Sequence, residues 1–176
     1  NYSKTKKLFV EYLKDIGKEI VTINMRLEHI YGSDDGENKF ISWLLNKLEN
    51  NNDVELTYGD QKRDFIYIDD VTDAYQKVIL SLDKSYDLGF KDLEIGSGSS
   101  VKLKVFVETL KDTLNSESSL KFGSLDYRDD EIMNSVANGS LEKFGYQNKV
   151  IFSFRNTEVG AQILARSYLA KLEKKR

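Results

Sequence analysis

The chain of 176 residues contains no cysteine and no proline. The lack of cysteine excludes a disulfide framework and a thiolate metal site, and it is the usage expected of a cytoplasmic protein. Without proline, the turns have to be made from glycine, asparagine, aspartate and serine, and these residues gather in the segments GSDDGEN, ENNND and GSGSS.

Histidine is nearly absent too, because His29 is the only one in the chain. With no second imidazole and no thiol, a metal site at His29 would need carboxylates for all its other ligands. The most conspicuous set of acids, Asp64, Asp69, Asp70 and Asp73, lacks the glycine and the terminal glutamate of a calcium loop. We therefore expect no metal site.

Long apolar runs and a strong excess of one charge are also missing. No segment approaches the roughly 20 apolar residues of a membrane span, and the first residues lack the pattern of a signal peptide. The net charge of -3 argues against nucleic acid as a partner. With 40% hydrophobic and 31% charged residues, the composition is that of a globular protein with neither kind of partner.

The apolar residues that are present follow two periods. Spacings of three and four predict helices at 2–16, 41–48, 71–82, 103–114 and from about Thr157, while alternation or short apolar runs predict strands at 19–27, 54–59, 64–68, 92–96 and 119–124. We expect Asp69 or Asp70 to cap the third helix, and the stretch LDYRDDEIMNS to be irregular. Alternating helices and strands predict an α/β fold with a largely parallel sheet.

The segment GSGSS follows a predicted strand and precedes a predicted helix, which is the position of a phosphate-binding loop. It is not a full G-x-G-x-x-G, and no Lys-Ser or Lys-Thr pair follows it. A turn with a serine cap on the next helix is therefore the better interpretation.

Tyr2 and Lys6 lie one helical turn apart at the start of the chain. Such a pair occurs readily by chance on an amphipathic surface helix, and on its own it favours that interpretation. The alternative is an acid/base pair, because an ammonium group beside a phenol lowers the pKa of the phenol and lets it exchange a proton near neutral pH.

Three further residues have spacing or surroundings that suit a ligand. His29 follows the strand predicted at 19–27, and open α/β sheets bind ligands at the carboxyl ends of their strands. Arg63 in GDQKRDF and Arg128 in DYRDDE stand in irregular segments among acids. An arginine fork suits phosphate oxygens, and the alternative for each arginine is a surface ion pair.

The order of these segments is more specific than any one of them. The succession YSKTKKLFVEYL, RLEHIYG, LTYGDQKRDFIYIDDVTDAY, LEIGSGSSVKLKVFVETL, FGSLDYRDDEIM and SLEKFGY resembles the C-terminal half of an extended short-chain dehydrogenase/reductase of the nucleotide-sugar type, the NAD-dependent epimerase/dehydratase group. RDFIYIDDV is its most specific element. Within the group, KFISWLLNKL, LTYGDQKRDF and FGSLDYRDDEIM are most similar to reductases that make CDP-3,6-dideoxyhexoses, of the CDP-abequose and CDP-paratose synthase type.

The resemblance implies the C-terminal part of a Rossmann-type parallel sheet and a smaller, mixed substrate-binding domain. Residues 1–36 would end the dinucleotide-binding domain, and residues 37–176 would form mainly the substrate-binding domain, with 64–96 returning to the Rossmann domain. Helix 2–16 would pair two copies into a homodimer. The 176 residues contain no Gly-rich dinucleotide fingerprint, so we expect them to be part of a longer enzyme and inactive alone.

The resemblance also implies a cofactor, NAD or NADP, and a hydride transfer, most simply at C4 of the hexose. Tyr2 would be the catalytic acid/base, and Lys6 would be its partner and would hold the nicotinamide ribose. Both would touch the cofactor, as would Leu27 and Glu28, which lie where the chain passes the nicotinamide.

On the substrate side, the resemblance implies a nucleoside-diphosphate hexose as the ligand. His29 would contact it, Arg63 and Arg128 would bind its pyrophosphate, and Glu131 would lie near its ribose. The family often has asparagine where this chain has His29, and proline where it has Ser33. A non-catalytic module that binds nucleotide sugars or forms dimers is the alternative function.

Overall fold

The structure is a computed structural model that describes residues 2–82 and 87–174, with only the backbone of Tyr2. The helices are α1 (Tyr2–Ile16), α2 (Phe40–Glu49), α3 (Ile68–Ser81), α4 (Leu103–Leu114), α5 (Ser140–Asn148) and α6 (Thr157–Glu173). The strands are β1 (Val21–Leu27), β2 (His29–Tyr31), β3 (Val54–Leu56), β4 (Lys62–Arg63), β5 (Phe65–Tyr67), β6 (Gly89–Ile95), β7 (Val101–Lys102), β8 (Leu120–Phe122) and β9 (Asn134–Ser135).

The strands pair mostly in parallel. β1 pairs with β6, β2 with β5, and β3 with β8, each in parallel. β4 lies between β7 and β9, antiparallel to the first and parallel to the second. The predicted α/β architecture with largely parallel pairing is therefore confirmed.

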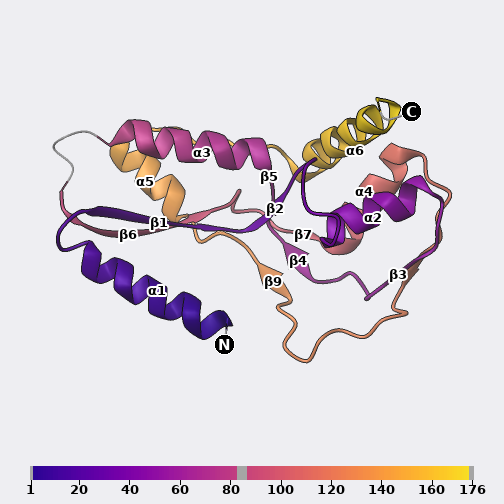
Figure 1. The fold of residues 1–176 in the computed structure, drawn as a ribbon, viewed down its shortest axis with the longest axis horizontal. Coiled ribbons are helices and arrows are strands. Elements are labelled where there is room, and N and C mark those ends of the chain that lie inside the picture. Colours follow the sequence, from indigo (N-terminus) through magenta and orange to yellow (C-terminus); the bar gives the residue numbers. More distant parts are fainter. Residues whose placement is uncertain (1, 83–86, 175–176) are drawn as a thin grey trace.

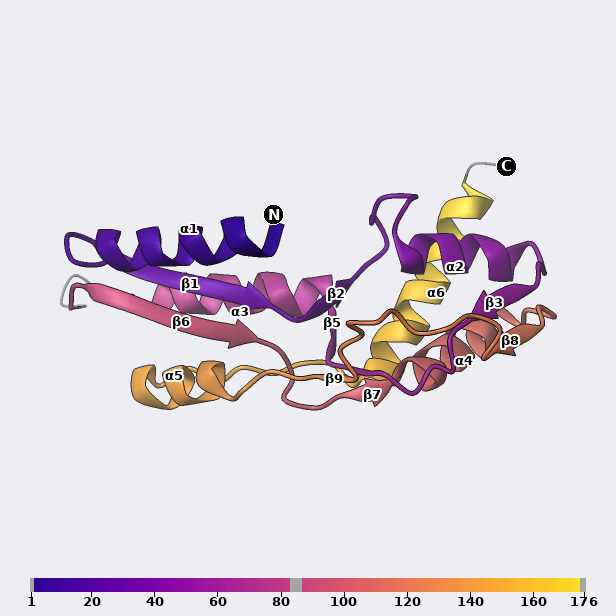
Figure 2. The same cartoon turned by 90° about the horizontal axis from the view of Figure 1, so that it is seen from below.

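Two groups of elements meet at β2 and β5 (Figure 1). In one group, α1 covers one face of the β1–β6 ribbon, and α3 and α5 lie on the other side (Figures 1 and 2). The other group is built on α2, α4 and α6. Each has its own hydrophobic core: one core joins α3, β6 and α5, and the other joins α2, α4 and α6 with β2, β3 and β5.

Aromatic rings fill the larger core. Phe65 stacks on Phe106 with ring centroids 4.2 Å apart, and Tyr31 meets Phe106 edge-on at 5.2 Å. The Tyr31 hydroxyl donates to the carbonyl of Thr157, and a Cβ at Gly160 would lie 1.9 Å from the Tyr31 oxygen. Glycine at 160 therefore lets α6 pack against β2.

Each helix and strand predicted from the spacing is present, with boundaries shifted by a few residues. The helix at 140–148 was not predicted, because α5 is short and buries only Leu141, Phe144 and Gly145. Strands β2, β4, β7 and β9 were not predicted either. They are two or three residues long. β3, β5 and β8 are equally short, but the apolar pattern predicted longer strands of five or six residues around each of them.

The predicted caps are wrong. Helix α3 begins at Ile68 with Tyr67 as N-cap and no capping side chain. Asp70 instead accepts a hydrogen bond of 2.7 Å from the backbone N–H of Arg155 and forms an ion pair with its guanidinium. A charged partner distant in sequence satisfies this nearly buried carboxylate better than a helix end would.

The GSGSS segment is a bent loop that connects β6 to β7, and its serine does not cap the next helix. Lys102 is the N-cap of α4 and gives no side-chain bond. The hydroxyl of Ser97 donates to Asp64 instead.

Helix α1 runs antiparallel to β1, so its N-terminal end lies on the side of the carboxyl end of β1 (Figures 1 and 2). Its outer side exposes Leu8, Phe9 and Tyr12, at 61%, 56% and 61%. Within the described residues, no helix has the length and apolar character that crossing a bilayer requires. Pairing of two copies through α1 stays a prediction.

Candidate functional site

The candidate site lies where the chain changes its partner strand. The backbone N–H of Glu28 donates to Ile95 at the end of β6, and the next N–H, of His29, donates to Asp64 just before β5, both at 3.1 Å. The change of partner brings the His29 side chain to the carboxyl end of β1, where the sequence predicted a ligand.

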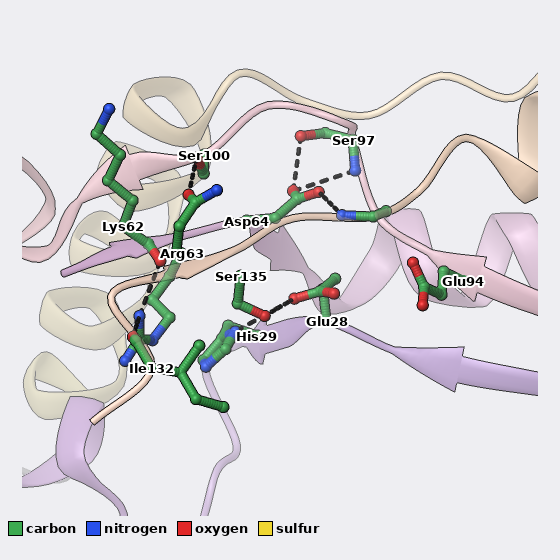
Figure 3. A network of polar contacts seen from close by, with 12 residues as sticks. Glu28, His29, Lys62, Arg63, Asp64, Glu94, Ser97, Ser100, Ile132 and Ser135 are labelled. Carbon is green, nitrogen blue, oxygen red and sulfur yellow. Dashed lines mark hydrogen bonds and ion pairs between the residues drawn. The ribbon is translucent and has the colours of Figure 1, made fainter. Parts of the chain in front are cut away.

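Asp64 fixes this junction. Its side chain is fully buried, and its carboxylate accepts four hydrogen bonds. Two come from the N–H and hydroxyl of Ser97 at 3.1 and 2.7 Å (Figure 3), one from Gly98 N–H at 3.0 Å and one from Ala137 N–H at 3.3 Å. A buried carboxylate is stable only when such donors surround it. Asp64 is therefore an organiser of the site and not a ligand contact.

Arg63 precedes Asp64, and its side chain points away from the Asp64 carboxylate and toward Ile132 (Figure 3). Its guanidinium donates to the carbonyls of Lys62, at 2.8 Å, and of Ile132, and it forms an ion pair with the carboxylate of Glu131 (Figure 3 shows the two carbonyl partners). The Arg63 and Glu131 side chains are only 11% and 19% exposed. Two residues that were predicted to bind different parts of a substrate are thus bound to each other.

Four predicted substrate residues line one cavity of about 230 Å³. These are His29, Arg63, Arg128 and Glu131, with Asp130 and Ile132 completing the wall. Arg128 comes from the irregular stretch that the sequence predicted, and its side chain is exposed. The structure therefore brings together residues from positions 29, 63 and 128–131.

Two larger cavities adjoin this one. A cavity of about 390 Å³ shares His29 and Arg63 with it, and another of about 470 Å³ shares Arg128 and Glu131. The two larger cavities also share Phe40, Gln61 and Leu103 with each other. We call the three joined cavities the cleft.

Sequence reasoning missed the aromatic wall of the cleft. Phe40 and Trp43 lie near the start of α2, 40% and 37% exposed, with ring centroids 5.9 Å apart. A signal was present, because the only tryptophan stands three residues after a phenylalanine in KFISW. It was hidden by the apolar pattern of the helix, which explains these residues as core.

Two cations of the cleft keep their charge available to a ligand. In the part of the chain that the structure describes, neither the ammonium of Lys39 nor the guanidinium of Arg128 has an ion-pair partner. Arg63, by contrast, is already paired with Glu131. The cleft is also lined by acids, which are Asp35, Glu55, Asp126, Asp130 and Glu131. Each of the two cations can nevertheless bind an anionic group of a ligand.

The pKa of the His29 imidazole is lowered from its usual value. Burial and the charge of Arg63 lower the pKa of the imidazole, while Glu28 and Asp64 raise it, and the net direction is downward. The ring is therefore neutral at neutral pH.

The predicted cofactor residues lie at the other side of the junction. Leu27 is exposed at the carboxyl end of β1, and the N-terminal turns of α1, which carry Tyr2 and Lys6, lie on that same side (Figure 2). Glu28 accepts a hydrogen bond of 2.7 Å from the Ser135 hydroxyl. Neither Lys6 nor Leu27 lines the cleft. The roles of Tyr2, Lys6, Leu27 and Glu28 stay predictions.

A match to a known family agrees with this arrangement. Residues 1–91, half of the chain, match the model of the NAD dependent epimerase/dehydratase family. The likeness named from the sequence is therefore confirmed at the level of the family.

Among curated proteins, the chain is 42% identical over 150 residues to a CDP-abequose synthase of Salmonella muenchen, which covers 83% of the chain and 50% of that protein. It is 33% identical over 129 residues to a dTDP-4-dehydro-6-deoxyglucose reductase of Escherichia coli, covering 69% of the chain and 39% of that protein. The chain thus spans half or less of the length of these relatives.

Solved structures show the same fold. A UDP-N-acetylglucosamine 4-epimerase from Methanobrevibacter ruminantium, in complex with UDP-N-acetylmuramic acid, superposes with a TM-score of 0.73 at 19% identity, over 93% of this chain and 51% of that one. A UDP-glucose 4-epimerase of Thermus thermophilus, in complex with NAD, gives a TM-score of 0.72 at 17% identity, over 96% and 53%. The predicted Rossmann-type fold is confirmed.

We predict that Asp64→Asn destabilises the chain by about 3 kcal/mol, because the amide places N–H groups where four donors need an acceptor. Urea unfolding followed by circular dichroism measures the loss. Asp60→Asn is the matched control, since Asp60 is exposed and its side chain pairs with the surface Lys102. Equal stability of the two variants would contradict the organising role of Asp64.

Proposed function

The chain belongs to the NAD-dependent epimerase/dehydratase family, and from this premise we propose that it is the substrate-binding part of an oxidoreductase that acts on a nucleoside-diphosphate hexose. The reaction would be hydride transfer between NAD(P) and C4 of the hexose. The names of the relatives, CDP-abequose synthase and dTDP-4-dehydro-6-deoxyglucose reductase, support a reductase and favour a cytidine nucleotide.

One observation carries the proposal: four residues expected to bind the substrate, separated by up to about a hundred positions, line a single cavity. Arg128 has no ion-pair partner among the described residues, and Arg63 is held by Glu131 and by the Ile132 carbonyl with its guanidinium at the cavity wall. Two arginine forks around one cavity suit the oxygens of a diphosphate.

The remaining cleft suits a nucleoside. Phe40 and Trp43 offer exposed rings beside Leu103, and a flat base can stack on or pack against such a wall. Glu131 lies between this aromatic wall and Arg63, where its carboxylate can accept from a ribose hydroxyl. The diphosphate would then run from Glu131 toward His29, with the hexose beyond it.

The end of the sheet fits the nicotinamide part of NAD(P). Leu27 presents exposed apolar surface at the carboxyl end of β1, and the N-terminal turns of α1, which carry Lys6, lie on the same side (Figure 2). NAD(P) would supply the hydride. Tyr2 would move the hydroxyl proton at C4, and Lys6 would hold the ribose and keep the phenol acidic. The 176 residues lack a Gly-rich fingerprint, so most of the cofactor site would lie on other residues.

A second candidate is a non-catalytic module that forms dimers. The exposed Leu8, Phe9 and Tyr12 on α1 favour it, because such an apolar stripe suits packing against a second copy. Dimerisation through α1 is compatible with ligand binding in the cleft, since no residue of α1 lines the cleft.

We predict that the chain binds CDP- or UDP-hexoses and that Arg128→Ala raises the dissociation constant by about 10-fold to 100-fold, the cost of losing a charge-assisted bond to phosphate. Isothermal titration calorimetry measures it, with Arg63→Ala as a second variant. Arg166→Ala is the matched control, because Arg166 is an exposed arginine on α6 that does not line the cleft. Unchanged affinity in Arg128→Ala would reject the phosphate contact.

We also predict that the purified 176-residue chain, given NAD(P)H and a CDP-4-keto-hexose, shows no turnover, because it supplies the acid/base pair and the substrate cleft without a pyrophosphate site for the cofactor. Absorbance at the nicotinamide band follows the reaction. Steady oxidation of the cofactor above the rate without protein would contradict the proposal that the pyrophosphate site for the cofactor lies on other residues.

A further inference from the structure

We propose that Glu28 and Ser135 are positioning residues: they hold the His29 ring with its Nδ1–H toward Glu28, so that a bare Nε2 faces the cleft and accepts a hydrogen bond from a hydroxyl of the hexose. This gives Glu28 a role other than the cofactor contact expected from the sequence. The inference rests on the proposed function, because it specifies which group of the nucleotide sugar His29 would contact in the same cleft.

The geometry of the three side chains is the first support. One oxygen of Glu28, Oε2, accepts the Ser135 hydroxyl at 2.7 Å and lies 3.5 Å from Nδ1 of His29 (Figure 3). The Glu28 side chain is 14% exposed, and that of His29 is 44% exposed. The carboxylate is therefore fixed from the buried side, and the ring is open to the cleft on its other edge.

The backbone leaves these side chains little freedom. The N–H groups of Glu28 and His29 donate to Ile95 of β6 and to Asp64, which precedes β5, and these bonds fix the backbone from which both side chains project. Gly96 makes room for the acid: a Cβ there would lie 3.1 Å from Cγ of Glu28 and 2.5 Å from Cβ of Ala137. Phe65 meets the imidazole edge-on at 6.2 Å.

The charges around the ring determine its protonation. Glu28, Arg63 and Asp64 act on it directly, and across the cavities it faces Asp35, Lys39, Arg128, Asp130 and Glu131. Burial and Arg63 outweigh the acids and lower the pKa of His29. A neutral ring carries one proton, and the adjacent carboxylate attracts that proton to Nδ1, which leaves a lone pair on Nε2.

A bare Nε2 discriminates between the groups of a nucleotide sugar. Ionised phosphate oxygens offer only lone pairs, so they gain no hydrogen bond from it, whereas a sugar hydroxyl has a proton to donate. The residues that line this cavity would therefore bind different parts of the ligand. Arg63 and Arg128 would bind the diphosphate, and His29 would accept a hydrogen bond from the hexose.

Because His29 is the only histidine, a ¹⁵N-labelled chain gives a single imidazole spin system. We expect, at pH 7.5, a neutral ring protonated at Nδ1 and not at Nε2. Glu28→Ala should lower the His29 pKa further, since it removes a raising charge, and should shift the proton toward Nε2. Ser135→Ala frees the Glu28 carboxylate to move, so it should shift the proton toward Nε2 to a smaller extent, and it is the milder variant if Glu28→Ala does not fold.

Glu94→Ala is the control, because Glu94 is similarly buried at 16% exposure but binds Arg26 and the backbone of Asn138. It should leave the imidazole signals unchanged. A wild-type ring protonated at Nε2, or an imidazole spectrum of Ser135→Ala identical to that of wild type, would overturn the positioning role.

The second arm compares CDP with a CDP-hexose by calorimetry. His29→Ala should weaken the CDP-hexose by about 10-fold and leave CDP unchanged, as expected for one lost hydrogen bond to the sugar. An equal loss of affinity for both ligands would mean that His29 contacts phosphate, and would overturn the proposed hydrogen bond between His29 and the hexose. If the wild-type chain binds neither ligand, the proposed function fails together with that hydrogen bond, while the ring's tautomer is decided by the spectrum alone.

Discussion

The buried carboxylate of Asp64 is the interaction on which the rest of the structure depends. Its oxygens satisfy donors of the turn after β6 and of the segment after β9, while its backbone bonds β2 and Ser135. A charge at this depth is tolerated only with its donors in place, so the segments cannot separate without a large penalty. The two groups of elements meet at β2 and β5 (Figure 1), next to Asp64, and its neighbours Arg63 and Phe65 line the cleft.

From this fixed point the chemistry of the cleft follows residue by residue. Arg63 precedes Asp64 and is directed to Glu131, and His29 pairs with Asp64 through its backbone. The cleft therefore presents three different states: a paired arginine, an exposed arginine at 128 and a neutral imidazole. The charge of these groups differs along the cleft. Such a surface suits a ligand whose charge also differs along its length, with a flat base, an anionic diphosphate and a neutral sugar.

The long elements were predicted well from the sequence, because periods of two and 3.6 are visible over seven or more residues. The prediction failed on β2, β4, β7 and β9, which have two or three residues, although the equally short β3, β5 and β8 were predicted. It also failed on the caps, where Asp70 and Ser97 have partners far along the chain, Arg155 and Asp64. The same limit applies to the site. Arg63 and Glu131 were both predicted, but their mutual ion pair across 68 positions has no local signal. Phe40 and Trp43 were missed because a helical core pattern explains them equally well.

A crystal structure of the chain with a CDP-hexose tests the central claim most directly. The account predicts the diphosphate between Arg63 and Arg128, the base against Phe40 and Trp43, and a hexose hydroxyl within hydrogen-bond distance of His29 Nε2. A nucleotide found instead in the neighbouring cavity between residues 32–37, α2 and α6, with its diphosphate beside Lys171 and away from Arg63 and Arg128, would contradict it.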